Sequence, residues 1–313
     1  MSTSDQTLAI IGCGKMGTAI LNGLLHAQPT PTTTDSPNPS LPDTFIATVR
    51  SPASLEALKA QFASKVTIAS SSSNPSAIGN ATTVLLACDP ADIPSLLTDP
   101  DIHATLSYTS NNTSPLPKLL ISIAAGWTVS ALTALLPETV QSRVHIIRAL
   151  PNIAAQISQS ITAIEIPAQG VIQEHLDLTE AIFKQIGRTV RVKPEQMDTF
   201  TVLGGSTPAF VGVFAEALVD GAVAMGFGRE EARMVVAQVL RGTGDLLLGG
   251  EHPALLKDRG TSPGGCTMGG LMVLEEGGFR GLVARAVREG VTVAGEMGKG
   301  DGGLVNGTRR GGR

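Results

Sequence analysis

Apolar and polar residues follow one another in a pattern typical of alternating strands and helices from Leu8 to Val192. Leu8–Ile11 is a short apolar run, and the segment after it repeats apolar residues at helical spacing. Further runs that predict strands lie at 45–49, 66–69, 83–87, 119–123, 144–149, 161–166 and 189–192. Strands that alternate with helices predict a parallel sheet covered by helices on both faces.

The pattern changes at about Pro194, where the strand signals stop. Helices are predicted from there over 207–225, 229–248, 263–276 and 280–297. Because they are rich in Ala, Val and Gly, we expect a bundle of closely packed helices, completed by a second copy of the chain. The polar stretches 28–43 and 101–117 predict loops, and the tail 298–313 is expected to be disordered.

Three glycines, Gly12, Gly14 and Gly17, follow the first predicted strand, and a helix comes next. In this position the G-x-G-x-x-G motif indicates a dinucleotide site, because its glycines allow a tight turn, a close approach of the pyrophosphate and close packing of helix on strand. We therefore expect a Rossmann-like dinucleotide-binding domain over residues 1–193. An all-helical domain for substrate binding and dimerisation is expected over residues 194–313.

Three further loops leave predicted strand ends and should line the same crevice, at Arg50–Ser51, Ala87–Pro90 and Ala124–Gly126. An acidic residue after the second strand would bind the ribose 2′-hydroxyl of NAD, but no acid follows Arg50 before Glu56. A guanidinium beside a hydroxyl suits a 2′-phosphate instead. The sequence predicts a preference for NADPH, with NADH as the alternative donor.

The segment around Ser262 has the residues of a helix start that can hold an anion. Ser262 would be the N-cap and Pro263 the first helical residue, followed by bare backbone at Gly264 and Gly265. The free amides of the first turn could then bind a carboxylate, with the hydroxyls of Ser262 and Thr267 beside it.

A second polar helix start is predicted at Ser206–Pro208. Neither segment places a His or Lys as an obvious acid or base. Reduction of a ketone generally needs a positioned acid, whereas an imine can bind already protonated and needs only orientation and a hydroxyl donor. The absence of such a residue favours an imine as the substrate.

Composition excludes several classes of function. A net charge of −4 gives no general attraction for nucleic acid or anionic membranes. The most apolar stretch, 210–227, is interrupted by Glu216 and Asp220, so no membrane span is expected. Three cysteines without paired spacing predict neither disulfides nor a metal site, and together with an N-terminus that lacks signal-peptide features they indicate a cytoplasmic protein.

Seven motifs are spread nearly from end to end of the chain: Ile11–Gly17, Leu86–Pro90, Ser122–Gly126, Arg148–Asn152, Leu203–Phe210, Asp220–Gly221 and the block from His252 to Arg280. Together they resemble the pyrroline-5-carboxylate reductases, which reduce a cyclic imine to L-proline in the last step of proline biosynthesis. The resemblance implies NAD(P)H as the hydride donor, a small-molecule substrate, and a homodimer that can assemble further.

The resemblance also implies roles for individual residues. Thr267 would hydrogen-bond the imine nitrogen, with Ser262 as the second catalytic residue. Substrate contacts are expected at Ser206, Lys257, Gly264, Gly265 and Cys266. The fingerprint, the strand-end loops and the resemblance together assign cofactor binding to Gly12, Cys13, Gly14, Lys15, Met16, Gly17, Arg50, Ser51, Ala87, Asp89, Pro90, Ser122, Ala124, Gly126 and Asn152.

The chain departs from the family pattern at Asp89, where the family usually has Lys, and at Thr207 and Phe210. One alternative is an oxidoreductase like the hydroxyacid dehydrogenases, but these carry a lysine in the helix after a glycine-rich turn, and none occurs from Gly204 to Met225. Another is a nucleotide-sensing protein that kept the fold and lost turnover.

Overall fold

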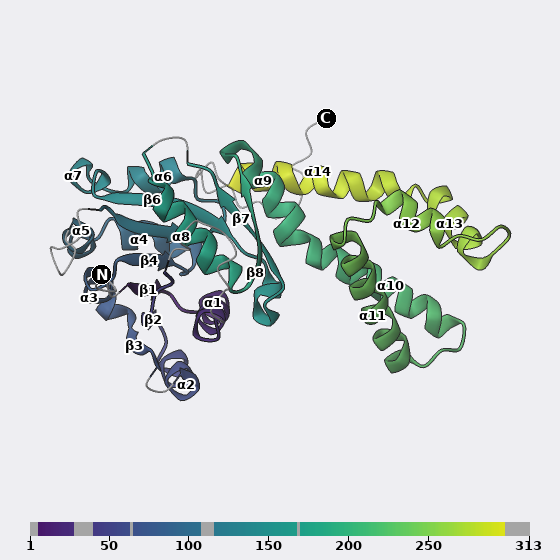
Figure 1. Cartoon of the computed structure of the whole chain (residues 1–313), viewed down its shortest axis with the longest axis horizontal. Coiled ribbons are helices and arrows are strands. Elements are labelled where there is room, and N and C mark those ends of the chain that lie inside the picture. Colours follow the sequence, from purple (N-terminus) through teal and green to yellow (C-terminus); the bar gives the residue numbers. More distant parts are fainter. Residues whose placement is uncertain (1–5, 28–39, 63–64, 108–115, 168–169, 298–313) are drawn as a thin grey trace. The chain divides into compact units, whose positions relative to one another are not determined.

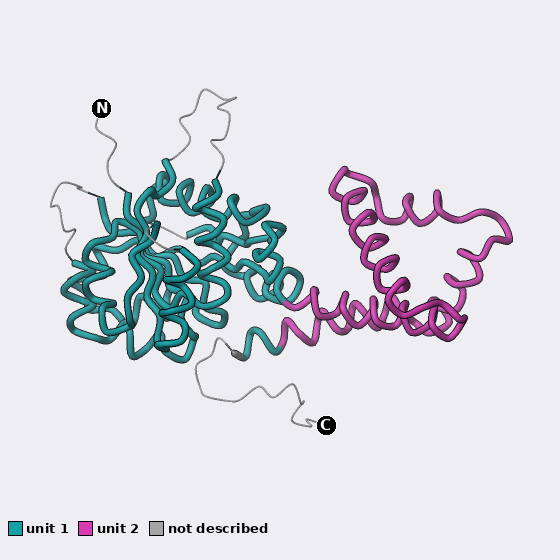
Figure 2. The backbone as a smooth tube through the Cα atoms, turned by 90° about the horizontal axis from the view of Figure 1, so that it is seen from below, with its two compact units in different colours: residues 1–205, 293–313 teal, residues 206–292 magenta. Residues whose placement is uncertain are grey.

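The computed structural model describes residues 6–27, 40–62, 65–107, 116–167 and 170–297. Contacts within the chain divide it into two compact units (Figure 2). Unit 1 comprises residues 1–205 together with 293–313, and unit 2 comprises residues 206–292. The division thus falls after Gly205, whereas the sequence pattern placed a domain boundary after residue 193. The predicted disordered tail and most of the predicted loop at 28–43 lie outside the described residues.

An eight-stranded sheet forms the centre of unit 1 (Figure 1), and its strands coincide with the eight predicted runs. Their order across the sheet is β3-β2-β1-β4-β5-β6-β7-β8, so the order of the first six is that of a dinucleotide-binding fold. The strands are β1 (Thr7–Ile11), β2 (Thr44–Val49), β3 (Thr67–Ser70), β4 (Thr83–Leu86), β5 (Lys118–Ser122), β6 (Val144–Leu150), β7 (Ser160–Glu165) and β8 (Gly187–Val192).

The prediction of a parallel sheet is correct except at one junction, because β7 runs antiparallel to β6. Only Pro151–Gln159 connects these strands, with the 3₁₀-helix η4 (Ile153–Ile157) inside it. A parallel crossover needs about a dozen residues or more, so the short connection returns the chain in the opposite direction. A buried ion pair between Arg148 of β6 and Glu165 of β7, 2.8 Å long, joins the two strands.

Helices cover both faces of the sheet, as predicted. Leu8 and Ile10 of β1 enter one apolar cluster, and Ala9 and Ile11 enter the other, as the two-residue period of a strand requires. One face packs on α1 (Lys15–Leu25), α2 (Pro52–Phe62) and α8 (Gln173–Lys184). The other packs on α3 (Asn74–Gly79), α4 (Ile93–Leu97), α5 (Pro100–Ser107), α6 (Val129–Ala134) and α7 (Glu138–Gln141).

The loop predicted over 101–117 is wrong in its first part. Residues Pro100–Ser107 form α5, and this helix buries Ile102 and Leu106 in the core. Because these two residues are four positions apart, they lie on the same face of the helix. Their burial holds the helix against the core although most of its other residues are polar.

The helix start predicted at Ser206–Pro208 is confirmed, because the helix begins at Thr207 with Ser206 as its N-cap and Pro208 in its first turn, but the Ser206 side chain makes no capping hydrogen bond and the residues before it are also helical. A helical stretch begins with α9 (Met197–Phe200) and continues through the π-helical turn η6 (Thr201–Ser206) into α10 (Thr207–Ala224). Pro208 lacks the amide that would bond to the carbonyl of Gly204, four residues earlier. The Asn152 side-chain amide donates to that carbonyl at 2.8 Å, so the helix passes through the proline without an unpaired carbonyl.

Unit 2 is entirely helical within the described residues. After α10 it contains α11 (Arg229–Leu248), α12 (Pro253–Arg259), α13 (Cys266–Glu276) and most of α14 (Phe279–Met297). Helices α10 and α11 pack antiparallel after a turn at Gly226, whose φ of +89° favours glycine. The rings of Phe214 and Phe279, with centroids 5.8 Å apart, join α10 to the start of α14.

The helical stretch Pro194–Ala224 is long and apolar enough to cross a membrane, judged by length and composition. The expectation that no membrane span is present was drawn from 210–227, where Glu216 and Asp220 interrupt the apolar run, and the length of this stretch does not decide it. A single stretch of this kind is weak evidence for a membrane span, since apolar helices of interfaces and cores have the same composition.

Candidate functional site

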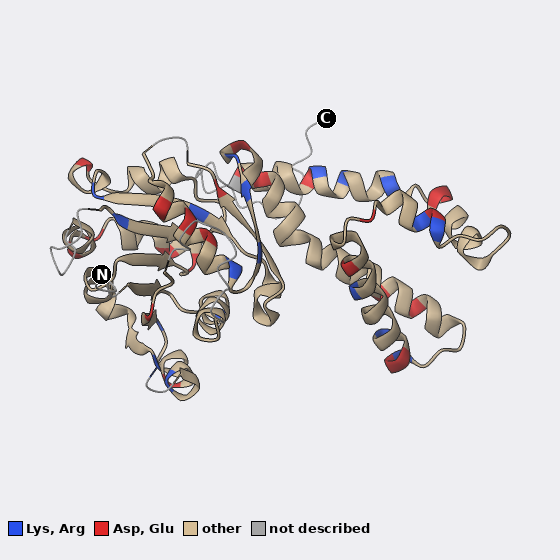
Figure 3. Ribbon diagram, in the orientation of Figure 1, with Lys and Arg blue, Asp and Glu red and all other residues tan. Residues whose placement is uncertain are grey.

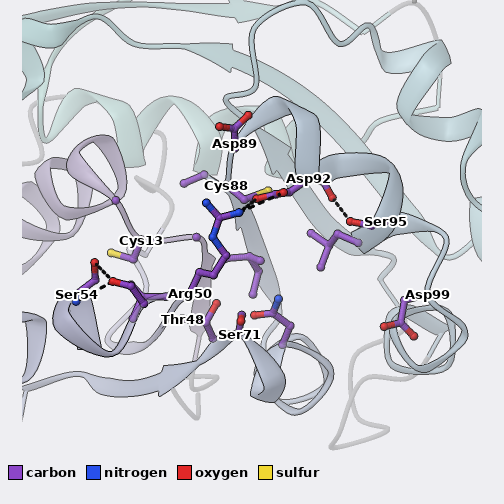
Figure 4. Close-up of a pocket in the computed structure, with 18 residues that line it drawn as sticks. Cys13, Thr48, Arg50, Ser54, Ser71, Cys88, Asp89, Asp92, Ser95 and Asp99 are labelled. Atoms are coloured by element: carbon purple, nitrogen blue, oxygen red, sulfur yellow. Dashed lines mark hydrogen bonds and ion pairs between the residues drawn. The ribbon is translucent and has the colours of Figure 1, made fainter. Parts of the chain in front are cut away.

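A cavity of about 700 Å³ opens at the carboxyl ends of β1, β2 and β4 (Figure 4). This is where the order of strands reverses, the position at which open parallel sheets bind ligands. Of the residues predicted to bind a dinucleotide, the cavity is lined by Gly12, Cys13, Gly14, Arg50, Ser51, Ala87 and Asp89.

Gly12 shapes the floor of this cavity. Its φ is +77°, and a side chain there would place its Cβ 2.4 Å from the Cα of Cys88, so only glycine fits. The Cys13 amide donates to the carbonyl of Thr48 at 2.8 Å, which ties the turn to the end of β2. The glycine turn is thus held between two neighbouring strand ends.

The first turn of α1 leaves its backbone amides open. Gly14 is the N-cap and provides no side-chain acceptor, so the amides of Lys15, Met16 and Gly17 have no partner within the helix. Gly17 is buried, and a Cβ there would come within 3.1 Å of Ile10. The helix therefore lies close against β1 with the positive end of its dipole at the cavity, as phosphate binding requires. The side chains of Lys15 and Met16 do not line the cavity.

Two residues after β2 border the cavity: Arg50, which is a cation, and Ser51, which caps a helix. Ser51 Oγ accepts the amide of Ser54 at 3.1 Å, so Ser51 caps the start of α2. The Arg50 guanidinium is four-fifths exposed and forms an ion pair of 3.1 Å with Asp92. Sequence reasoning missed this partner, which follows β4 rather than β2.

Two orphaned polar atoms also face this region. Thr48 Oγ1 is buried and Asn74 Oδ1 is buried, and neither has a hydrogen-bond partner among the described residues. Both residues line the cavity (Figure 4 labels Thr48). Since a buried polar atom without a partner is costly, these atoms fit a ligand that bears hydroxyl or amino groups. A polar ligand with phosphates therefore suits this cavity.

Asp89 caps a short helix, a role that the sequence did not predict. Its carboxylate accepts the amide of Ala91 at 3.0 Å and caps the 3₁₀-helix η3 (Pro90–Asp92). The next loop is fastened to the same place, because the Trp127 indole donates to the carbonyl of Pro90 at 3.0 Å. Replacement of the usual family lysine by Asp89 is thus accompanied by a local capping contact.

The remaining predicted cofactor residues lie along the strand ends but outside the cavity. Ser122 is buried and its Oγ accepts the amide of Ala124 at 3.3 Å, while Gly126 has a φ of +79°. Asn152 follows β6, and its side chain is engaged with Ala154 and Gly204. These residues lie at the ends of the strands beyond β4, and the Asn152 side chain connects η4 to η6 through its two hydrogen bonds.

In unit 2 the helix start predicted with Ser262 as its N-cap is wrong by three residues. Helix α13 begins at Cys266 with Gly265 as its N-cap. Ser262–Gly265 form a turn instead, in which the Gly265 amide donates to the Ser262 carbonyl at 3.1 Å and Gly264 has a φ of +69°. Proline followed by a glycine with positive φ is the pattern of a type II turn, which competes with proline at a helix start.

The start of α13 at Cys266 still leaves backbone amides without partners within the helix, at residues later than predicted. Cys266 and Thr267 now lie in the first turn of α13, at the positive end of its dipole, and both are exposed. Ser262 Oγ would stand 2.5 Å from a Cβ on Gly265, so its hydroxyl lies against the N-cap. The predicted elements of a carboxylate site therefore remain adjacent within this segment.

Lys257 lies in α12 beside the same segment. Its ammonium pairs with the neighbouring Asp258, and the hydroxyl of Thr261 donates to its carbonyl at 2.7 Å. Lys257 also lines a shallow hollow with Met268 and Met272 of α13. His252, which sequence reasoning gave no role, caps α12 by accepting the amide of Ala254 at 3.2 Å.

The cysteines are unpaired, and burial raises the pKa of both Cys13 and Cys88 to about 11. Their thiols are therefore protonated at neutral pH. No group of three or more His, Cys, Asp or Glu side chains suited to a metal ion occurs in the part of the chain that the structure describes.

Two family models match this chain. Residues 194–297 match the model described as pyrroline-5-carboxylate reductase dimerisation. Residues 7–126 match the model described as NADP oxidoreductase, coenzyme F420-dependent. The two matches cover the helical segments and the dinucleotide-type half of the sheet, respectively.

Full-length relatives agree with these models. A pyrroline-5-carboxylate reductase from Lophium arboricola is 44% identical and covers 98% of this chain and 97% of its own length. One from Neurospora crassa is 40% identical and covers 98% of both. The solved structure of the reductase from Coxiella burnetii has a TM-score of 0.75 at 26% identity and covers 95% of this chain and all of its own. The chain belongs to the pyrroline-5-carboxylate reductase family and is an oxidoreductase.

Proposed function

We propose that this protein reduces 1-pyrroline-5-carboxylate to L-proline with NADPH, as a homodimer. The observation that carries the proposal is the pairing, in one chain, of a phosphate-suited helix start at Gly12–Gly17 with a carboxylate-suited helix start at Gly265–Thr267. Relatives of nearly equal length bear the same activity in their names.

NADPH, when bound, supplies the hydride. The open amides of α1 would hold its pyrophosphate, and Thr48 and Asn74 offer acceptors in the same cavity. Arg50 provides the positive charge that a 2′-phosphate needs. A solved relative from Plasmodium falciparum, at 24% identity and a TM-score of 0.74, contains bound NADP and has this fold.

The substrate carries a carboxylate and an imine nitrogen. The amides of Cys266 and Thr267 would bind the carboxylate, and the Thr267 hydroxyl would orient the nitrogen. Because a protonated imine is already electrophilic, these residues need to position it and stabilise its charge rather than donate a proton. Ser262 would add a second hydroxyl next to the N-cap.

A second copy of the chain would cover the apolar helices of unit 2. The matched dimerisation model spans the same residues, which makes an interface a better account of Pro194–Ala224 than a membrane. Three unpaired cysteines and a net charge of −4 support a cytoplasmic protein without affinity for nucleic acid.

The experiment is a turnover assay with the purified full chain. NADPH oxidation should require added 1-pyrroline-5-carboxylate and should yield an equal amount of proline, measured by chromatography. Binding of NADPH without turnover would identify a nucleotide-sensing protein, and turnover only with hydroxyacids or ketoacids would identify the dehydrogenase alternative.

A further inference from the structure

We propose that Asp92, through its ion pair with Arg50, sets how strongly this protein discriminates between NADPH and NADH. The inference rests on the proposed function, because it assumes that the cavity at the ends of β1, β2 and β4 holds the adenosine side of a nicotinamide dinucleotide. It assigns a specificity role to a residue that no motif marks.

The two side chains come from different loops. Arg50 follows β2, and Asp92 closes η3 after β4. Arg50 Nη1 donates to both carboxylate oxygens of Asp92, at 3.1 Å and 3.5 Å. Both residues line the cavity, and Figure 4 shows the guanidinium reaching across to the carboxylate. An acid therefore stands beside Arg50, although none follows it closely in the sequence.

This pair has opposite effects on the two cofactors. An acid at the end of β2 in related folds accepts the ribose 2′-hydroxyl of NAD, and Asp92 presents a carboxylate beside that position from the loop after β4. A 2′-phosphate, by contrast, would bind Arg50 and would be repelled by Asp92, which also occupies part of the guanidinium. Asp92 thus favours NADH and limits the preference for NADPH that Arg50 provides.

The charge of Asp92 matters more than its support of the Arg50 conformation. The Arg50 side chain is 80% exposed and that of Asp92 is 44% exposed, and exposed ion pairs hold their partners weakly. The backbone of Asp92 is held independently, since its amide donates to the Asp89 carbonyl and its carbonyl accepts from Ser95 Oγ, each at 2.9 Å. Replacing the carboxylate by a carboxamide should therefore leave the loop in place.

The test measures binding by the full-length protein in the absence of any imine. Dissociation constants for NADPH and NADH are obtained from the fluorescence of the reduced nicotinamide. Asp92→Asn should lower the dissociation constant for NADPH and raise the one for NADH. The ratio of the two constants should shift in favour of NADPH by about tenfold, since contacts to charged groups have effects of this size. Arg50→Ala should weaken NADPH and leave NADH nearly unchanged.

Asp99→Asn is the matched control. Asp99 lines the same cavity, but its carboxylate accepts the Asp101 amide, a contact that asparagine can keep. It should change the ratio by less than about twofold, because a screened surface charge without a direct contact has little effect. In an Arg50→Ala background, Asp92→Asn should improve NADPH affinity less than in the unmodified protein, because only the direct repulsion between the carboxylate and the 2′-phosphate is then relieved.

An unchanged ratio in Asp92→Asn, or an equal shift in Asp99→Asn, would overturn the inference and leave the proposed function standing. Failure of the unmodified protein to bind either dinucleotide would overturn both. A full gain in NADPH affinity in the Arg50→Ala background would show that Asp92 does not act through Arg50, and would also overturn the inference.

Discussion

Unit 1 and unit 2 bury their apolar residues to very different degrees. In unit 1 the sheet separates two large apolar clusters that are closed by its own helices. In the described part of unit 2 the buried apolar residues are Val219 and Ala232, while Val213, Met225 and Met234 are each more than three-fifths exposed. Figure 3 shows few charges along α10, whose charged residues are Glu216 and Asp220.

The difference teaches that the units acquire stability in different ways. The core of unit 1 is complete within one chain, so its site can be shaped by internal packing. Unit 2 leaves apolar side chains of α10 and α11 exposed, which is expected when a second chain provides the missing half of the core.

Gly12 is a residue of unit 1 at which a single methyl group would disturb both the internal packing and the proposed cofactor cavity. Gly12→Ala forces a Cβ against Cys88 and requires a positive φ, so it should lower the free energy of unfolding by about 3 kcal/mol and weaken NADPH binding at least about 100-fold. Chemical denaturation and fluorescence titration measure the two effects. Wild-type affinity in this variant would contradict the assignment of the glycine turn to the cofactor.

Gly14→Ala is its control. Gly14 has a φ of −81°, and the nearest atom to an added Cβ is 3.9 Å away, so alanine fits the protein. Stability should stay within about 1 kcal/mol of the unmodified protein, whereas NADPH should still bind about tenfold more weakly because the methyl group blocks the pyrophosphate.

Leu218 tests whether unit 2 is completed by a second chain. It lies seven residues after Val211 on the same face of α10, and both side chains are about two-fifths exposed. Leu218→Glu would bury a charge in the interface and should raise the dissociation constant of the dimer at least about 100-fold. Analytical ultracentrifugation measures the change, and Gln238→Glu on α11 is the control. A dimer of unaltered affinity would show that this face of α10 is not the interface.

Thr267 tests the chemistry of unit 2 rather than its assembly. Thr267→Ala removes the hydroxyl in the first turn of α13 and should lower kcat about 100-fold while leaving the NADPH dissociation constant within a factor of about two. Steady-state kinetics and fluorescence titration separate these effects. Thr267→Ser should restore most of the rate. An equal loss of NADPH affinity would move Thr267 to the cofactor side.

The sequence predicted what depends on local periodicity. All eight strands were found because each is a short apolar run between turn signals, and Gly12 was found because its motif follows a strand. The start of α13 was misplaced because Pro263 and Gly264 suit both a helix start and a tight turn, and only the backbone decides between them.

What depends on contacts between distant segments was missed. Asp92 meets Arg50 across 42 residues, and Thr48 acquires its unpaired hydroxyl only through burial between strands. The direction of β7 likewise follows from the length of its connection to β6, which the predicted strand boundaries did not resolve. Elements could therefore be read from the sequence, whereas the partners of individual polar groups could not.

A pair of histidines in unit 1 tests whether burial within this unit makes its stability depend on pH. His145 of β6 and His175 of α8 share a hydrogen bond of 2.9 Å between their Nδ1 atoms, so one ring donates and the other accepts. Burial, with a smaller contribution from His145, lowers the pKa of His175 to about 4. Burial also lowers the pKa of His145. Both rings are therefore neutral in the folded protein at neutral pH.

This shift makes stability depend on pH with a defined sign. Between the lowered pKa of His175 and its ordinary value of 6.5, the unfolded chain binds more protons than the folded one. The free energy of unfolding should thus fall by about 2 kcal/mol from this residue as the pH drops from about 7.5 to about 5. His175→Gln should lose that part of the decrease, measured by urea denaturation at both pH values. The exposed His26 offers the control His26→Gln, which should keep it. If both variants retain the full decrease, His175 is not its source.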